Sequence, residues 1–287
     1  MTTIMDVFNS LNFVTLIISF PPNFFIIAVN ILDFFKTRRL LLSDLLISGI
    51  TIANLLQSFL KAFLQYHFQL ISKGYLKIGV FVALYLSTCT LLFSALLSIH
   101  FCLKIVNINH RFYICLQRSL PKLFPGIILT FLLGCLFLNL HSALDTNQGC
   151  LSNTTSKLVE VTHPKCSWSL FITMTISALG TFLCFVSALT ILISLLKHMK
   201  RIQGNTEGSG SPNMEAHIRA IKTITSLLAA NSFTFTSIFM RAFSEGFWIF
   251  LSGLLISVCY IFSSYFFIKG TKKLDKTLEE ILKQCLC

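Results

Sequence analysis

The chain has 287 residues, of which 54% are hydrophobic and only 12% are charged, and its mean hydropathy is +0.77. Because a soluble domain carries about a quarter charged residues, this composition excludes an ordinary water-soluble fold and indicates a protein that lies largely in lipid. The net charge of +12 does not indicate nucleic-acid binding, since the basic residues form short clusters between apolar runs.

The first ten residues contain Asp6 and neither Lys nor Arg, so they lack the basic start of a secretory signal and we expect the first apolar segment to be retained. A helix needs ~20 apolar residues to cross ~30 Å of hydrocarbon. Seven runs meet this length, at 11–34, 40–64, 78–106, 120–140, 168–196, 221–243 and 247–268. The predicted fold is an all-α membrane protein, a seven-transmembrane helix bundle forming a single domain over 1–287, with a short tail at 269–287.

The distribution of basic residues predicts the orientation of these runs, because cytoplasmic loops carry the excess of Lys and Arg. With the N-terminus extracellular and the C-terminus cytoplasmic, 17 basic residues fall on the inner side and 6 on the outer side, Lys61 among the six. The opposite orientation would place 17 basic residues outside and 6 inside, contrary to this rule. We therefore expect an outside N-terminus and an inside tail.

The connection at 141–167 is extracellular in this orientation. It contains the sequon Asn153-Thr154-Thr155, so we expect glycosylation at Asn153. It also contains Cys150 and Cys166, the two cysteines that share a polar loop where a disulfide can persist. Pairing of Cys150 with Cys166 and two free thiols both remain open.

Few ionisable residues occur within the predicted spans. Asp33 and Asp44 lie near the inner ends of the first two, whereas a proton-coupled pump or an aspartyl protease needs carboxylates near the midplane. His100 is deep in the third run, where a single histidine is more often a packing residue than a proton relay. The sequence contains no metalloprotease, dinucleotide-binding or Walker A motif. We expect no enzyme activity, cofactor or metal.

If the chain is a receptor, residues that it lacks argue against two classes of ligand. The outer half of the third run has no carboxylate for an amine, and the seventh run, 247–268, has no lysine for a retinal Schiff base. A cavity with mostly apolar walls and a few hydroxyl groups remains. Ser87 and Thr88 offer such hydroxyls, although such groups often bond to the carbonyls of their own helix instead.

The predicted inner ends carry a family resemblance. Residues 194–228 read SLLKHMKRIQGNTEGSGSPNMEAHIRAIKTITSLL, with Lys197-His198, Ala216-His217 and Ala220-Ile221-Lys222-Thr223 in order. This segment resembles the third intracellular loop and sixth-helix entrance of bitter taste receptors, the taste receptor type 2 family. The run from Leu103 to His110 resembles the family's L-K-I-A-N-F-S-H segment, and 270–274 its G-N-x-K-L segment.

The chain also departs from the family pattern at several positions. The family's Ser-Arg in the second helix corresponds to Ala53-Asn54, and its Asn-His in the third helix corresponds to Ser87-Thr88. Its proline after the second-loop histidine corresponds to Arg111, and its seventh-helix Pro and His correspond to Tyr260 and Ser263. The sequence is thus similar to a divergent member, and the agonists of other members do not transfer to it.

The resemblance implies a G-protein-coupled chemosensory receptor in the plasma membrane, which binds a small, bitter molecule in the outer half of the bundle and activates a heterotrimeric G protein of the gustducin type. The implied agonist-binding residues are Leu84, Ser87, Thr88, Phe239, Phe243 and Trp248. The implied G-protein-facing residues are Lys104, Asn107, Lys197, His198, His217 and Lys222. For single lysines, attraction to anionic lipid is an equally good interpretation.

The tail, 269–287, has apolar residues at spacings of three to four with lysines between them, a pattern suited to lying on the inner leaflet. Cys285 and Cys287 are candidates for palmitoylation there, or free thiols. Two alternatives to a bitter taste receptor remain at this point. One is a vomeronasal type 1 receptor, which shares the short N-terminus and seven-span layout, and the other is a small-solute transporter or channel.

Overall fold

The computed structural model describes residues 2–38, 41–66, 73–106, 111–148, 168–203, 212–243 and 247–286. These residues form eight helices and no strand. The helices are α1 (Thr2–Thr37), α2 (Leu42–Tyr66), α3 (Lys73–Ile105), α4 (Arg111–Gln148), α5 (Trp168–Gln203), α6 (Pro212–Phe243), α7 (Phe247–Gly270) and α8 (Lys272–Leu286). The seven apolar runs of the sequence fall in α1 to α7, apart from a residue or two at the ends of α2 and α3.

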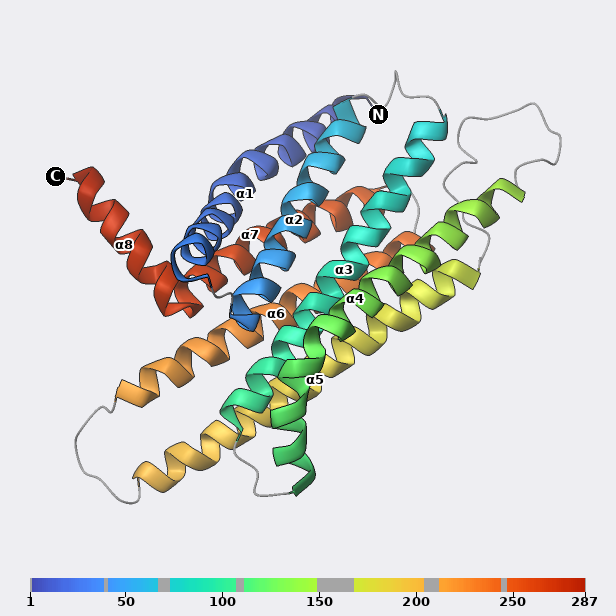
Figure 1. The fold of residues 1–287 in the computed structure, drawn as a ribbon. Helices are drawn as coiled ribbons and strands as arrows, with labels where there is room; N and C mark the ends of the chain where they lie inside the picture. The colour runs from blue at the N-terminus through green and yellow to red at the C-terminus, as the bar shows by residue number, and fades with distance from the viewer. Residues whose placement is uncertain are drawn as a thin grey trace.

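Helices α1 to α7 form one elongated bundle, and α8 leaves it at the end of α7, beside one end of α1 (Figure 1). Neighbouring helices pack in the order α1, α2, α3, α5, α6, α7 and back to α1, with α4 against α3 and α5. Helix α3 lies inside the bundle, in contact with α2, α4, α5 and α6. Helix α2 also touches α7. The α2–α7 contact carries the polar groups described below.

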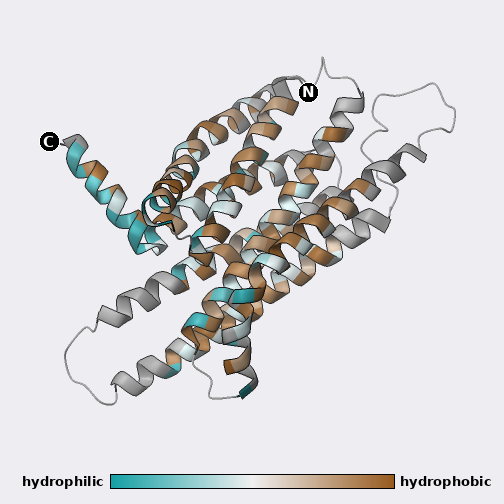
Figure 2. Cartoon of the chain, in the orientation of Figure 1, coloured by the Kyte–Doolittle hydropathy of each residue, from teal (hydrophilic) through white to brown (hydrophobic). Residues whose placement is uncertain are grey.

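The bundle has apolar side chains on its outside and many polar ones inside, the reverse of a water-soluble protein. Leu32, Phe137 and Phe182 are all at least 60% exposed, whereas Asn23, Asn54 and Ser264 are buried. Hydrophobic residues cover the long helices, and hydrophilic ones gather on α8 and near one end of the bundle (Figure 2). Within the described residues, five helices are long and apolar enough to cross a membrane, at 13–37, 42–64, 81–105, 174–194 and 253–270.

Helix α6 carries many serine and threonine residues. Most of these hydroxyl groups donate to a carbonyl oxygen one turn earlier in the same helix, as Ser232 does to Leu228 at 2.8 Å and Thr234 to Ala230 at 2.9 Å. Such bonds satisfy the hydroxyl within the helix. Hydropathy therefore overstates the polarity that α6 presents to its surroundings. The described side chains of α4 include the apolar stretch 122–137.

The main apolar core joins α8 to the bundle. Leu274 of α8 is fully buried and belongs to the same cluster as Ile26 of α1, Ile47 of α2 and Phe267 of α7. Leu278, one turn further, packs against this cluster, whereas Ile281 and Leu282 are exposed. The apolar face of the first turns of α8 thus packs against the bundle. Only the later turns present apolar side chains that can contact lipid.

Candidate functional site

The implied agonist-binding residues lie on three helices. Leu84 and Ser87 of α3 are partly buried, and Thr88 is buried with its hydroxyl donating to the Leu84 carbonyl oxygen at 2.8 Å. Phe239 of α6 is 47% exposed. Because α3 contacts α6, these residues belong to neighbouring helices. Phe243 ends α6 and Trp248 is the second residue of α7, and the side chains of both lie outside the described part of the chain.

The implied G-protein-facing residues are spread over α3, α5 and α6. Lys104, Lys197 and Lys222 are exposed. His198 and His217 belong to α5 and α6, but their side chains, like all of Asn107, lie outside the described residues. His100 is partly buried, with its ring edge-on to Phe124 at a centroid distance of 6.1 Å, which agrees with a packing role.

The extracellular-loop predictions cannot be placed on the fold, because Asn153, Cys150 and Cys166 lie outside the described residues. The same holds for Cys287, whereas Cys285 falls in the last turn of α8 without a described side chain. Within the described residues, no group of three or more His, Cys, Asp or Glu side chains is arranged to hold a metal ion.

A line of polar side chains joins α2 to α7. We call Asn54, Gln57, Lys61, Ser257 and Tyr260 the α2–α7 seam. The Tyr260 hydroxyl donates to Gln57 Oε1 at 2.6 Å. Lys61 Nζ donates to the Gly253 carbonyl oxygen at 3.2 Å and to Ser257 Oγ at 3.3 Å, and it lies 5.7 Å from the centre of the Tyr260 ring. The seam thus holds a lysine ammonium between two helices.

The seam continues to two neighbouring helices. On one side, Thr90 Oγ1 of α3 lies 3.5 Å from Asn54 Oδ1. On the other, Ser264 Oγ of α7 lies 2.8 Å from Asn23 Oδ1 of α1 and 2.9 Å from the Tyr260 carbonyl oxygen. Four helices therefore meet through buried hydrogen-bonding groups, an arrangement that fixes their relative positions because each unmade buried bond costs about 1–3 kcal/mol.

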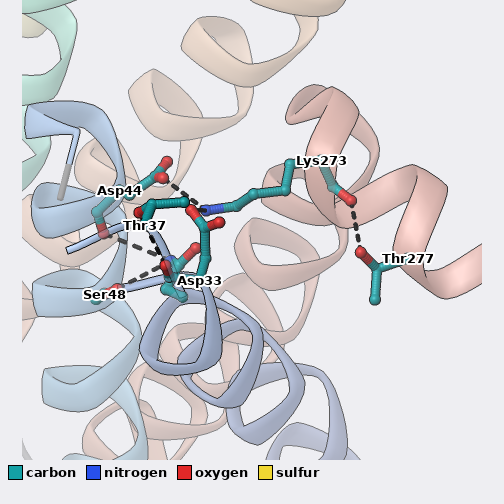
Figure 3. Close-up of polar contacts among 7 residues, drawn as sticks. Asp33, Thr37, Asp44, Ser48, Lys273 and Thr277 are labelled. Carbon is teal, nitrogen blue, oxygen red and sulfur yellow. Dashed lines mark hydrogen bonds and ion pairs between the residues drawn. The ribbon is translucent and has the colours of Figure 1, made fainter. Parts of the chain in front are cut away.

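A second polar cluster joins α8 to α1 and α2. Lys273 Nζ lies 2.6 Å from Asp44 Oδ2 and 3.1 Å from Asp33 Oδ2, so one ammonium bridges two carboxylates (Figure 3). We call these contacts the Lys273 ion pairs. Asp44 is buried, whereas Asp33 and Lys273 are partly exposed to solvent. The backbone around the pairs is held by Asn30, whose amide donates to Ser48 Oγ at 2.9 Å and approaches the Asp44 carbonyl oxygen at 3.5 Å.

The charge balance at Lys273 is favourable. Partial burial lowers the pKa of Lys273, but the hydrogen bonds and negative charges of Asp44 and Asp33 outweigh this effect, and the net pKa is raised above the usual 10.5. Lys273 is therefore fully protonated at neutral pH. The ion pairs attach α8 to the ends of α1 and α2 in addition to the apolar contact of Leu274.

Comparison with known proteins gives the family. The sequence model for taste receptor protein (TAS2R) matches residues 1–286. The chain belongs to the taste receptor family. Human taste receptor type 2 member 2 is 28% identical over 86% of this chain and 80% of its own length. Taste receptor type 2 member 9 of Papio hamadryas is 27% identical over 91% of this chain and 88% of its own length. Member 4 of Gorilla gorilla gorilla is 30% identical over 74% of this chain and 72% of its own length.

As a member of the taste receptor family, the protein is a chemosensory receptor of the G-protein-coupled class, which confirms the resemblance drawn from the inner loops. Five positions where this taste receptor departs from the family pattern are buried: Ala53, Asn54, Thr88, Tyr260 and Ser263. Two of them, Asn54 and Tyr260, belong to the α2–α7 seam. The divergence of this receptor therefore includes its interior.

The sequence alone assigned no partner to Lys61 or to Lys273. Lys61 entered only the count of charges on each side, and Lys273 entered that count, the 270–274 resemblance and the pattern of the tail. A signal for Lys61 was present, because Asn54, Gln57 and Lys61 recur at spacings of three and four and so share one face of α2. Ser257 and Tyr260 are likewise three apart on α7. Polar residues on facing stripes of two apolar helices predict a buried polar contact.

Proposed function

We propose that this chain is a bitter taste receptor of the plasma membrane, with seven transmembrane helices in one domain, that couples binding of a small agonist in its outer half to a gustducin-type heterotrimeric G protein. The match of the taste receptor family over residues 1–286 carries this proposal. The related proteins named as taste receptor type 2 members support the same activity here.

The proposed topology places the N-terminus outside and the C-terminus inside. Helices α1 to α7 each have at least 24 residues, or about 36 Å at 1.5 Å per residue, which exceeds the ~30 Å hydrocarbon core. The excess of basic residues on the predicted inner side supports the orientation. Asn153→Gln tests it: loss of a glycosidase-sensitive shift in electrophoretic mobility is expected, and an unglycosylated wild-type chain would contradict the outside position of 141–167.

The proposed agonist site lies between the outer halves of α3, α5, α6 and α7. Leu84, Phe239, Phe243 and Trp248 would supply apolar contact, and Ser87 and Thr88 would orient the ligand. The agonist shifts the receptor toward its active arrangement only by its differential affinity for the two states. Ser87→Ala and Trp248→Ala should each weaken the agonist response without lowering surface expression, and unchanged dose-response curves would remove those residues from the site.

The proposed G-protein contact uses the opposite end of the bundle. Lys104, Lys197 and Lys222 are exposed there, as a contact surface requires. His198 and His217 are the more informative candidates, because the positive-inside rule calls for Lys or Arg and not for histidine. His217→Ala should reduce G-protein activation while agonist binding persists.

One experiment in transfected cells tests the whole proposal. Calcium release through a gustducin-containing G protein is measured against a panel of bitter compounds, together with uptake of the same compounds. Agonist-dependent calcium release without uptake is the expected result. Solute flux without G-protein activation would overturn the receptor function in favour of a transporter.

A further inference from the structure

A buried cysteine of α5 is hydrogen-bonded to both α3 and α6. Ser98 Oγ of α3 donates to Cys184 Sγ at 3.4 Å, and Asn231 Nδ2 of α6 donates to the same sulfur at 2.9 Å. All three residues are at most 2% exposed. We call Ser98, Cys184 and Asn231 the Cys184 cluster. Because α3, α5 and α6 also contact one another in pairs, the cluster links three neighbouring helices through one sulfur atom.

About two turns further toward the proposed inner side, the same three helices meet through apolar side chains. Val106 after α3, Ile191 of α5 and Ile224 of α6 are buried and form one cluster, which we call the apolar layer. At 1.5 Å per residue, this layer lies about 11 Å along the helices from the Cys184 cluster. The three helices are therefore closed on one another at the inner end of α3.

The Cys184 cluster lies between the proposed agonist site and the proposed G-protein contact. Asn231 of α6 is about 12 Å along the helix from Phe239 on the outer side and about 14 Å from Lys222 on the inner side. Ser98 has the corresponding place on α3. A rearrangement that reaches from one proposed site to the other along these helices therefore passes through the cluster.

The two hydrogen bonds depend on the spacing of the helices. A shift of α6 away from α5 breaks the bond from Asn231 to Cys184 and leaves a buried amide nitrogen without this acceptor. A buried donor that loses its acceptor is unfavourable, so the bonds favour the arrangement in which α3, α5 and α6 are packed together. The apolar layer is buried in that same arrangement.

We propose that the Cys184 cluster holds α6 against α3 and α5 and thereby limits the activity of the receptor without agonist. Separation of α6 breaks the cluster and uncovers the apolar layer on the side where the G-protein contact is proposed. This inference rests on the proposed function for its meaning in signalling, since it gives that function the element that keeps the receptor inactive. The movement of α6 itself is tested without any signalling.

A thiol placed in the apolar layer reports its opening. The purified full-length receptor carrying Ile224→Cys is treated in detergent with N-ethylmaleimide, and the labelling rate of each cysteine is measured by mass spectrometry. Adding Asn231→Leu should raise the rate at position 224 about fivefold, the change in an equilibrium that the loss of one ordinary hydrogen bond produces. Cys115 is exposed on α4 and serves as the internal reference, whose rate should not change. An unchanged rate at position 224 would overturn the proposal.

Matched variants separate this role from a general loss of packing. Ser232→Ala removes the neighbouring hydroxyl of α6, which donates to the Leu228 carbonyl oxygen of its own helix, and should leave labelling and basal activity unchanged. Cys184→Ala removes the shared acceptor and should act like Asn231→Leu, and it decides the question if Asn231→Leu does not fold. The two changes together should add little to either one alone. Fully independent effects, or a lower unfolding temperature without faster labelling, would overturn the proposal.

The outcome is separable from that of the proposed function. In transfected cells, Asn231→Leu should raise calcium release without agonist about fivefold at equal surface expression. A receptor that responds to bitter compounds but whose basal release and labelling do not change in Asn231→Leu or Cys184→Ala retains its function and loses this role of the cluster. A receptor in which Asn231→Leu speeds labelling, but which activates no G protein, retains the cluster as the element that holds α6 and loses the proposed function.

Discussion

Lys273 and Lys61 hold their charges in different ways. Lys273, at the junction of α8 with α1 and α2, lies within 3.1 Å of two carboxylates, one of them buried. Lys61, between α2 and α7, donates to a backbone carbonyl and a serine hydroxyl and lies against a tyrosine ring. The first arrangement matches a positive charge with negative ones. The second places a positive charge against dipoles and a π face.

This difference indicates different roles. A cation paired with two carboxylates in good geometry leaves little capacity for another ligand, so the Lys273 ion pairs serve to position α8. The inner junction is therefore structural, whereas the seam joins two bundle helices through hydrogen bonds and a ring contact. Substitutions on each side test this comparison.

The largest effect is expected from Lys273→Met. It leaves Asp44 buried beside the like charge of Asp33, and breaking a buried ion pair costs about 3–5 kcal/mol. Because water reaches Lys273 and Asp33, we expect the lower end, about 3 kcal/mol, measured as a lower unfolding temperature of the purified receptor.

The matched control for that variant is Lys272→Met, which removes the exposed neighbouring charge and should have little effect. Adding Asp44→Asn to Lys273→Met should restore part of the lost stability, because it removes the uncompensated charge. A Lys273→Met receptor as stable as the wild type would show that α8 is held by apolar contacts alone.

Gly270→Ala should have the next largest effect, and it tests how tightly the inner junction is packed. A methyl group at this position would collide with Thr223 Oγ1 of α6 and would lie 3.2 Å from Thr223 Cβ. Overpacking of this kind costs about 2 kcal/mol, again measured by thermal unfolding. Thr223→Ala in the same chain should relieve the collision, whereas Thr223→Val, which puts a methyl group in the place of the hydroxyl, should not.

Tyr260→Phe is the corresponding change in the seam, and its effect should be smaller. It removes the 2.6 Å hydrogen bond from the Tyr260 hydroxyl to Gln57 Oε1. Both polar atoms of the buried Gln57 amide then lack a hydrogen-bond partner, at a cost of about 1 kcal/mol. Combining it with Gln57→Leu should be less than additive, because the pair then loses both partners together. Strictly additive losses would mean that the two side chains do not interact in the receptor.

The helices could be predicted from the sequence because membrane-crossing segments need long apolar runs, and α1 to α7 contain those runs. The Lys273 ion pairs could not be predicted from the sequence, because Lys273 is 240 residues away from Asp33. A count of basic residues assigns each of them to a side of the membrane and does not identify its partners. The position of Lys61 was partly predictable from the sequence. The spacing of Asn54, Gln57 and Lys61 was visible, but only the fold shows that this stripe faces Ser257 and Tyr260 rather than lipid.

The smallest effect is expected from pH, and it tests the pairing of Lys273 with its two carboxylates. The pKa of Lys273 is raised in the folded receptor, so its contribution to stability is complete below the unfolded value of about 10.5 and is lost only as the pH rises through the folded value. Between pH 6 and 9, the wild type and Lys273→Met should therefore differ by a constant amount in unfolding temperature. Above pH 10.5 this difference should shrink as the ammonium loses its proton and the two carboxylates lose their partner. A difference that already disappears near pH 8 would mean that burial, and not the carboxylates, governs the pKa of Lys273.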